Sequence, residues 1–198
     1  MKNLKLKPLL HSLMTVALLT VLMTSCEKET INPIEEEMLS IEEQAPISKN
    51  LSNDVQLRSF NKSCFVKLCY SSYMGRCGDQ GGINYWLGIL GNASSNKIAS
   101  VAIGFINSQE AKNKWENNYS SFLAANGLTR SQVKKSVYIA YRGLLLRQPD
   151  VGGGKYWTTQ ANNHGLRHAV KGIASSQEFF NRLNNIAVEC NAYNANCP

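Results

Sequence analysis

The folded part of this chain has few of the residues that enzymes use for chemistry. Histidine occurs three times in 198 residues, and only His164 and His168 follow the N-terminal segment described below. The cysteines do not have the C-x-x-C spacing of a structural zinc site. No alternating run is long enough for a dependable strand, and no apolar run is long enough for a dependable membrane span. These absences disfavour nucleophilic catalysis, a zinc site and a β-sheet fold.

The N-terminus has the pattern of a secretory signal. Three lysines precede an apolar run from about Leu9 to Met23, and small residues lead to Cys26. The sequence LMTSC, residues 22–26, resembles the lipobox of bacterial lipoproteins, with Met23 in place of the more usual Leu. We therefore expect a lipoprotein signal peptide at residues 1–25 and acylation of Cys26, with palmitate among its acyl chains. Ordinary secretion with Cys26 as a thiol is the alternative.

Residues 26–56 are expected to form a flexible acidic tether. Between Glu27 and Asn50 the chain has seven glutamates, two lysines, two prolines and no aromatic residue, so it buries too little apolar surface to order itself. The segment Glu27–Thr30 resembles the short charged tag that directs some bacterial lipoproteins to the outer face of the outer membrane. We expect an outer membrane lipoprotein exposed at the cell surface; a secreted or periplasmic protein is the alternative.

The remaining chain is basic. Residues 51–198 contain sixteen Lys plus Arg and seven Asp plus Glu, a net charge of +9. Such a surplus favours anionic partners, here an anionic glycan, an envelope protein or membrane headgroups, besides the membrane that the N-terminal lipid enters. The expected location disfavours nucleic acid. The alternative interpretation is that the charge serves solubility alone.

Five cysteines lie in this basic part, in a compartment that permits disulfides. Their number is odd, so at least one stays unpaired, and two pairs can form in fifteen ways. We expect a local bridge between Cys190 and Cys197 and one pair among Cys64, Cys69 and Cys77. No metal site and no cofactor is expected.

The chain contains two copies of one unit. An offset of 71 residues aligns RCGDQGGINYW, residues 76–86, with RQPDVGGGKYW, residues 147–157, and also Tyr70 with Tyr141. After a three-residue deletion, Gly104 aligns with Gly172 and SQE at 108–110 with SQE at 176–178. The copies are expected at residues 57–127 and 128–198, the second including the cysteine-containing tail.

Both copies have the periodicity of helices. Apolar residues recur three and four apart in residues 64–74 and 136–146, and again in residues 108–127. Ser108 and Ser176 are expected to be N-caps, with glutamates in the first turn. The predicted fold is all-α, a compact helical domain built from two tandem helical repeats.

The best-matched segments predict a structural corner rather than a catalytic loop. We expect Pro149 to end one helix, Asp150 to cap the next, the glycines to allow close packing and Tyr156 with Trp157 to be buried. Arg147 is expected to reach a carbonyl or carboxylate across the corner. The alternatives are a general base at the aspartate and an exposed anion contact at the arginine. One acid per copy is too few for a calcium loop. The corner residues are Arg76, Asp79, Gly82, Tyr85 and Trp86, and Arg147, Asp150, Gly153, Tyr156 and Trp157.

These residues resemble the bacterial domain of unknown function 4214 family. The second copy has its pattern L-x-R-x-P-D-x-x-G-x-x-Y-W, followed by G-I-x-x-S-x-E-F from Gly172 to Phe179. The first copy has Gly78 for the proline and Ala111 for the phenylalanine, which predicts a looser corner. The resemblance implies a helical fold related to phycobilisome linker domains and a secreted or surface protein, and it supplies no established enzymatic activity to transfer.

Two functions from different classes follow. We expect a non-enzymatic, lipid-anchored cell-envelope module that binds or scaffolds an anionic glycan, protein or envelope component. The alternative is a small hydrolase of envelope polymers, which would bring one of three glutamates together with a histidine. The residues that this alternative requires are Glu116, Glu178 or Glu189, with His164 or His168.

Overall fold

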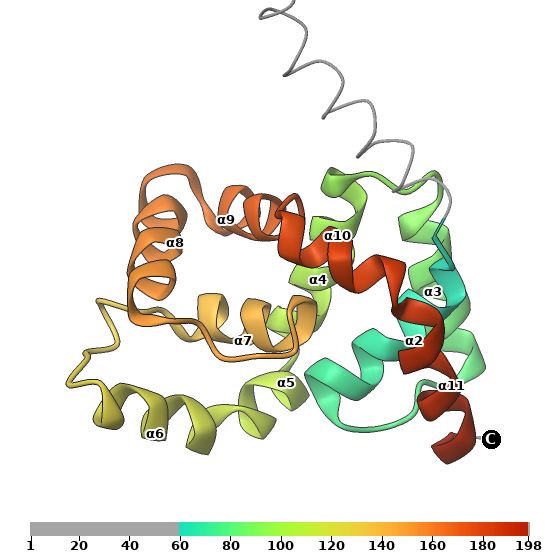
Figure 1. The fold of residues 1–198 in the computed structure, drawn as a ribbon, viewed down its shortest axis with the longest axis horizontal. Coiled ribbons are helices and arrows are strands. Elements are labelled where there is room, and N and C mark those ends of the chain that lie inside the picture. The colour runs from blue at the N-terminus through green and yellow to red at the C-terminus, as the bar shows by residue number, and fades with distance from the viewer. Residues whose placement is uncertain (1–59, 198) are drawn as a thin grey trace, which may run out of the picture. The chain divides into compact units, whose positions relative to one another are not determined.

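The computed structural model describes residues 60–197, and within this range the chain forms helices and no strand (Figure 1). The predicted all-α fold is confirmed. The signal peptide, Cys26 and the tether of residues 26–56 lie outside the described residues. No helix within residues 60–197 combines the length and the hydropathy that a membrane crossing requires.

The helices follow each other in the same order in both copies. The first copy forms α2 (Lys62–Cys69), the π-helical turn η1 (Tyr70–Met74), α3 (Gln80–Leu90), α4 (Ser95–Asn107), α5 (Gln109–Lys114) and α6 (Glu116–Ala125). The second forms α7 (Lys135–Leu144), α8 (Val151–His164), α9 (Leu166–Ile173), α10 (Gln177–Asn184) and α11 (Ile186–Asn196). The sequence offset therefore pairs α2 and η1 with α7, α3 with α8, α4 with α9, α5 with α10, and α6 with α11.

Serine caps begin α5 and α10 at equivalent positions. The hydroxyl of Ser108 accepts a hydrogen bond from the backbone N–H of Ala111 at 3.1 Å, and Ser176 accepts one from Phe179 at 3.2 Å. Each cap satisfies an N–H that has no partner within its own helix, which is worth about 1 kcal/mol. The local sequence thus fixes where these two helices start.

The first helix of each copy ends before the corner. α7 stops at Leu144, so Pro149 does not terminate it, contrary to the sequence expectation. Instead the chain turns at Leu146, whose φ is 56°. Gly75, the equivalent residue of the first copy, has a φ of 75° and follows η1. A left-handed residue therefore ends this helix in both copies.

Basic side chains satisfy the last carbonyls of these helices. Arg182 of α10 donates to the carbonyls of Gly143 and Leu144 at 2.7 and 2.8 Å. Lys114, its counterpart in α5, donates to two carbonyls of η1 at 3.0 and 3.3 Å. Cations at a helix C-terminus also interact favourably with the helix dipole.

The two copies share one apolar core. Phe65 of α2 contacts Phe179 of α10 edge to face, with ring centroids 6.1 Å apart. The ring of Tyr73 lies against Gly143 of α7, where a Cβ atom would come within 1.9 Å of it. Since burying one such aromatic side chain contributes about 1.5–3 kcal/mol, these contacts hold the copies together.

The last helix of each copy packs on the first helix of the other copy. α11 packs on α2, and α6 packs on α7, where Glu116 pairs with Lys135 and the rings of Phe122 and Tyr138 lie 5.4 Å apart. α4 and α9 also pack together. The two copies therefore close on each other, with the C-terminal helix returning to the start of the described chain.

Two disulfides secure this return. Cys64 of α2 is bonded to Cys190 of α11, and Cys77 of the first corner is bonded to Cys197. The predicted bridges, Cys190–Cys197 and a pair among the first three cysteines, are wrong. The reason is tertiary, because α11 runs beside α2 and presents each of its cysteines to a different one in the first copy. Cys69 is a free, buried thiol.

Candidate functional site

The aspartates of both corners are helix caps. The Asp79 carboxylate accepts a hydrogen bond from the N–H of Gly82 at 2.8 Å, and Asp150 accepts one from Gly153 at 2.7 Å. These hydrogen bonds lower the pKa of each aspartate below its ordinary value. A carboxylate held in its ionised form as a cap is a poor general base, so the geometry favours the structural interpretation.

The arginines close the corners across two helices. Arg147 donates to both carboxylate oxygens of Glu178 at 2.5 and 2.8 Å, and to the carbonyl of Gln148 at 3.1 Å. Its guanidinium also lies 5.1 Å from the centre of the Tyr141 ring. The first copy repeats the arrangement, since Arg76 donates to a carboxylate oxygen of Glu110 at 2.6 Å. Both corner arginines are therefore engaged within the fold.

The repeated glycines allow side chains to approach closely. A Cβ atom at Gly82 or Gly153 would come within 2.0 or 2.6 Å of the Tyr70 or Tyr141 hydroxyl. A Cβ atom at the second repeated glycine position, Gly104 in α4 and Gly172 in α9, would come within 2.1 Å of a tryptophan ring. Trp86 and Trp157 therefore pack directly on the helix that follows their own.

The tyrosines of both corners are exposed to solvent, whereas the sequence predicted that Tyr156 is buried. Tyr156 was expected to be buried with Trp157, but its side chain is 55 % exposed, and its counterpart Tyr85 is 62 % exposed. Each ring lies edge-on to its neighbouring tryptophan, at 4.8 Å for Tyr156 and 4.9 Å for Tyr85. The tryptophan fills the space over the glycine, so the tyrosine beside it is left facing solvent.

The first corner is tied to the C-terminal helix. Its Gly78 has an N–H where the second copy has a proline, and this N–H donates to the hydroxyl of Tyr193 in α11 at 2.8 Å. Cys77, one residue earlier, carries the disulfide to Cys197. A Cβ atom at Gly78 would also come within 2.5 Å of the Tyr70 ring. The C-terminal helix thus contacts the first corner at the position where the second copy has a proline, and the looser corner stays a prediction.

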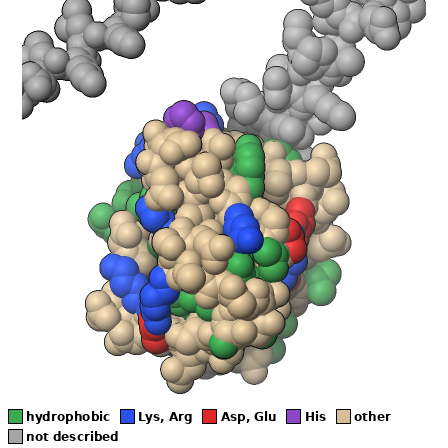
Figure 2. Space-filling model, turned by 90° about the vertical axis from the view of Figure 1, so that its left-hand side faces the viewer, with side chains coloured by type: hydrophobic (Ala, Val, Ile, Leu, Met, Phe, Trp, Pro, Cys, Tyr) green, Lys and Arg blue, Asp and Glu red, His purple; other side chains and the backbone are tan. Residues whose placement is uncertain are grey.

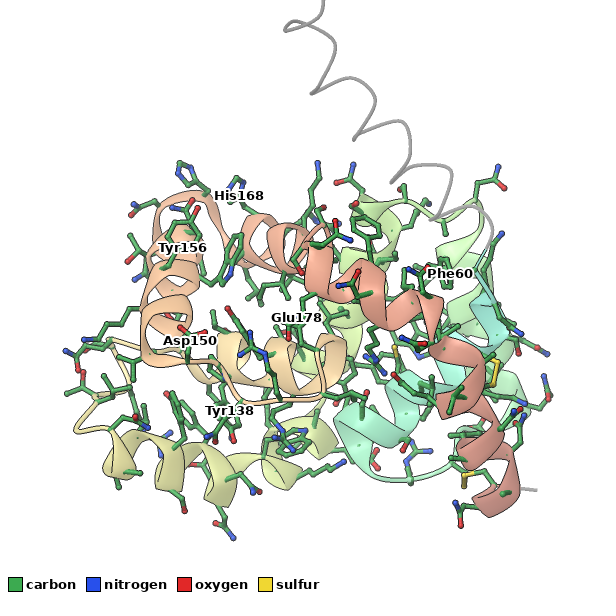
Figure 3. The ribbon with its side chains drawn as sticks, viewed as in Figure 1. Phe60, Tyr138, Asp150, Tyr156, His168 and Glu178 are labelled. Atoms are coloured by element: carbon green, nitrogen blue, oxygen red, sulfur yellow. A yellow bond between two sulfur atoms is a disulfide. The ribbon has the colours of Figure 1, made fainter. Side chains whose placement is uncertain are left out.

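The residues considered for a hydrolase do not form an acid–base pair. Glu116, Glu178 and Glu189 each pair with basic side chains. Glu116 pairs with Arg130 and Lys135. Glu178 pairs with Arg147, and Glu189 pairs with Arg182 at 2.7 Å. The rings of His164 and His168 lie 4.9 Å from each other, and Figure 3 shows His168 at the edge of the view, away from Glu178. Within residues 60–197, no three His, Cys, Asp or Glu side chains form a group that could hold a metal ion.

Four adjacent helices have no carboxylate within their bounds, although Asp79 and Asp150 cap the N-termini of α3 and α8. α8 packs against α9, α9 against α4, and α4 against α3, as Figure 1 shows. The six acidic residues within residues 60–197 all lie outside these four helices, where they act as caps or pair with Arg and Lys. The layer instead carries Lys97, Lys155, Arg167, Lys171, His164 and His168, all of them exposed. We call these helices the basic layer.

The centre of the basic layer joins the two copies. Arg167 of α9 donates to the hydroxyl of Ser100 in α4 at 2.9 Å. Lys171 lies one turn after Arg167, and Lys97 lies one turn before Ser100. In Figure 2 the histidine side chains lie at the upper edge of the molecule with a Lys or Arg side chain beside them. The two helices that this hydrogen bond joins therefore carry exposed cations, Lys97 in one copy and Arg167 with Lys171 in the other.

The sequence carried a signal for the basic layer that the net charge alone did not reveal. Counting acids helix by helix shows none in α3, α4, α8 or α9, and none in α2, η1 or α7 either, so the count alone does not single out the layer. That the four helices lie next to each other could not be read from the same count, because it depends on the contact between the two copies. The corner residues were found from the repeat; the layer between the corners was not.

Comparison with known families agrees with the repeated architecture. The protein is an all-helical tandem repeat, and it belongs to the family described as domain of unknown function DUF4214, whose model matches residues 48–115 and 118–183. No curated protein and no solved structure matches the chain. The second match ends at Leu183, before α11, so both cysteines of the C-terminal helix lie outside the family's unit. The relation to phycobilisome linker domains stays a prediction.

Proposed function

We propose that the protein is a non-enzymatic, lipid-anchored module of the bacterial cell envelope, and that its basic layer binds an anionic partner. One observation carries the proposal: within the described residues, four adjacent helices hold four Lys or Arg and two His side chains but no carboxylate. Charge of one sign on one surface attracts polyanions and raises the rate of their association.

The pairing of the carboxylates supports this assignment. Each acidic residue within residues 60–197 already caps a helix or pairs with a basic side chain of the fold. These ion pairs use Arg76, Arg130, Lys135, Arg147 and Arg182. The cations of the basic layer are not among them. They are therefore available to an external anion.

The ion pairs of the glutamates also support a non-enzymatic function. The glutamates needed for acid–base work on a polymer are held by Arg or Lys, and hydrogen bonds from Lys135 and Arg130 lower the pKa of Glu116 to about 2. A general acid requires a raised pKa, so Glu116 is unsuited to that role. The family contributes no activity that could be transferred. A binding module is the function that these residues support best.

The anchor is proposed from residues outside the described range. The lysines, the apolar run and LMTSC before the charged tether are the features of a lipoprotein precursor. Each acyl methylene that enters the bilayer contributes about 0.8 kcal/mol, so several chains on Cys26 hold the protein durably. The tether then gives the helical domain reach from the outer membrane to its partner.

Binding and anchoring are tested separately. For binding, the detergent-solubilised full-length protein is passed over an immobilised acidic polymer, and Arg167→Glu/Lys171→Glu is compared with Lys112→Glu/Lys134→Glu, which changes the charge equally outside the basic layer. We expect the first variant alone to lose retention on the polymer. Equal loss in both variants would mean that retention depends on net charge and not on the basic layer.

For anchoring, Cys26→Ala should move the protein from the membrane fraction to the soluble fraction. Retention of that variant in the membrane would refute lipidation at Cys26.

A further inference from the structure

A chain of contacts connects the two exposed tyrosines across the basic layer. Tyr156 lies beside Trp157, whose ring lies over Gly172 of α9, next to Lys171. One turn earlier on α9, Arg167 donates to Ser100 of α4. On the other side of this junction, Gly104 of α4 lies one turn after Ser100 and under Trp86, beside Tyr85. These contacts link one exposed tyrosine of each copy to the helices that carry Lys97, Arg167 and Lys171.

The tyrosine rings have no packing role that would explain their exposure. Each contacts the adjacent tryptophan, and the tryptophan alone fills the space above the glycine. The exposed residue just before each tyrosine differs between the copies, Asn84 in one and Lys155 in the other, while both copies present a tyrosine at the next position. Tyrosine is enriched at protein interfaces, because its ring is apolar and its hydroxyl is polar.

The chemistry of this surface fits a sugar chain that carries carboxylates. A pyranose ring presents C–H groups on its faces, and these pack against a flat aromatic ring while its hydroxyls bond to nearby polar side chains. A uronic acid adds a carboxylate that pairs with arginine or lysine. Phosphate headgroups and acidic peptides without sugar rings would use the cations but not both tyrosines. The two tyrosine rings therefore favour an acidic sugar chain over the other anionic partners.

We propose that the basic layer binds an acidic polysaccharide chain, whose sugar rings lie on Tyr85 and Tyr156 and whose carboxylates pair with Arg167, Lys171 and Lys97. This inference rests on the proposed function, since it names the partner of the same surface. The two ends are unequal. Lys155 stands beside Tyr156, whereas the uncharged Asn84 stands beside Tyr85, so the second copy makes the stronger contact.

The test separates ring recognition from charge. Full-length protein in detergent is titrated with oligogalacturonate, with polyglutamate as an acidic polymer without sugar rings, and with neutral dextran. The variants are Tyr85→Ala/Tyr156→Ala and Tyr85→Phe/Tyr156→Phe, the second of which keeps both rings. Circular dichroism verifies that each variant is folded; both substitutions are at exposed positions.

We expect the alanine variant to bind oligogalacturonate about tenfold more weakly than the wild type, because two ring contacts are lost. Its affinity for polyglutamate should not change, the phenylalanine variant should retain most of the oligogalacturonate affinity, and dextran should not bind.

Two results overturn the inference in different ways. If the alanine variant binds oligogalacturonate as tightly as the wild type, the polysaccharide assignment fails while anion binding by the basic layer stands. Equal affinity of the wild type for polyglutamate and oligogalacturonate would have the same meaning. If the wild type binds none of these anions, the proposed function fails with it.

Discussion

Leu146 occupies the position in the second copy that Gly75 occupies in the first, and both residues have a positive φ, 56° and 75°. A left-handed backbone costs a residue with a Cβ atom about 1–2 kcal/mol, a cost that glycine does not have. The second copy therefore holds an exposed leucine in a strained turn where the first copy has an unstrained glycine.

The first prediction concerns this turn. Leu146→Gly should raise the free energy of unfolding by about 0.5–1 kcal/mol, because relief of the strain exceeds the extra chain entropy of glycine in the unfolded state. The matched control is Leu145→Gly, which replaces a residue with a φ of −113° and should destabilise the protein. Urea unfolding measures both variants. If Leu146→Gly were as destabilising as the control, the turn would not be strained.

The second prediction tests the packing of the tryptophans. Gly172→Ala places a Cβ atom within 2.1 Å of the Trp157 ring, and such overpacking costs about 1–3 kcal/mol. Gly88→Ala lies within α3 and meets nothing within 4 Å, so it should stabilise the protein by up to about 1 kcal/mol. Thermal unfolding distinguishes the two. Opposite signs support the packing, and equal effects would contradict it.

The third prediction is a dependence of stability on pH. Hydrogen bonds from Lys135 and Arg130 lower the pKa of Glu116 from 4.5 to about 2. A pKa that is lower in the folded state stabilises the protein above 4.5 and loses that contribution as the pH falls toward 2. Glu116→Gln should therefore lower the melting temperature at neutral pH and converge with the wild type in acid. A constant difference at all pH values would show that the charge of Glu116 is not involved.

The fourth prediction concerns the disulfides. Peptide mapping without reduction should recover fragments that join Cys64 to Cys190 and Cys77 to Cys197; a fragment that joins Cys190 to Cys197 would refute the arrangement. The first bond links residues 126 positions apart, and closing so long a loop stabilises the folded state by up to about 5 kcal/mol. Each bond already closes most of the other's loop, so either pair of alanines should cost less than this. Cys64→Ala/Cys190→Ala should destabilise the protein more than Cys77→Ala/Cys197→Ala, because Cys64 and Cys190 are buried and Cys77 is exposed.

The fifth prediction concerns the remaining thiol. Burial raises the pKa of Cys69 to about 12, so it carries almost no reactive thiolate at neutral pH. Iodoacetamide should modify Cys69 only after unfolding, as mass spectrometry of the native and denatured protein will show. Rapid modification of the native protein would mean that this part of the core opens.

The sequence predicted the parts of the fold that depend on local chemistry. The offset that aligns Asp79 with Asp150 identified both corners, and the glycines and serines around them indicated where helices begin. The exposure of Tyr156 could not be predicted, because a helical pattern does not show which of two adjacent aromatic residues packs on the next helix. Trp157 takes that place over Gly172.

The disulfides and the basic layer could not be predicted from the sequence, and the physical reason is the same for both. Both depend on how the second copy folds back on the first. α11 lies on α2, which brings Cys190 to Cys64, and α9 lies on α4, which brings Arg167 to Ser100. No spacing within either copy encodes these contacts.

The most direct test of the account is to locate the bound anion on the protein. Isotope-labelled full-length protein in detergent is titrated with an acidic polymer, and the backbone amide shifts are followed by NMR. The account predicts that the largest changes lie in α9 and α4, around Arg167, Lys171 and Lys97, and that added salt reverses them. Changes concentrated in α5 and α10, or spread evenly over every lysine and arginine, would contradict a binding surface on the basic layer.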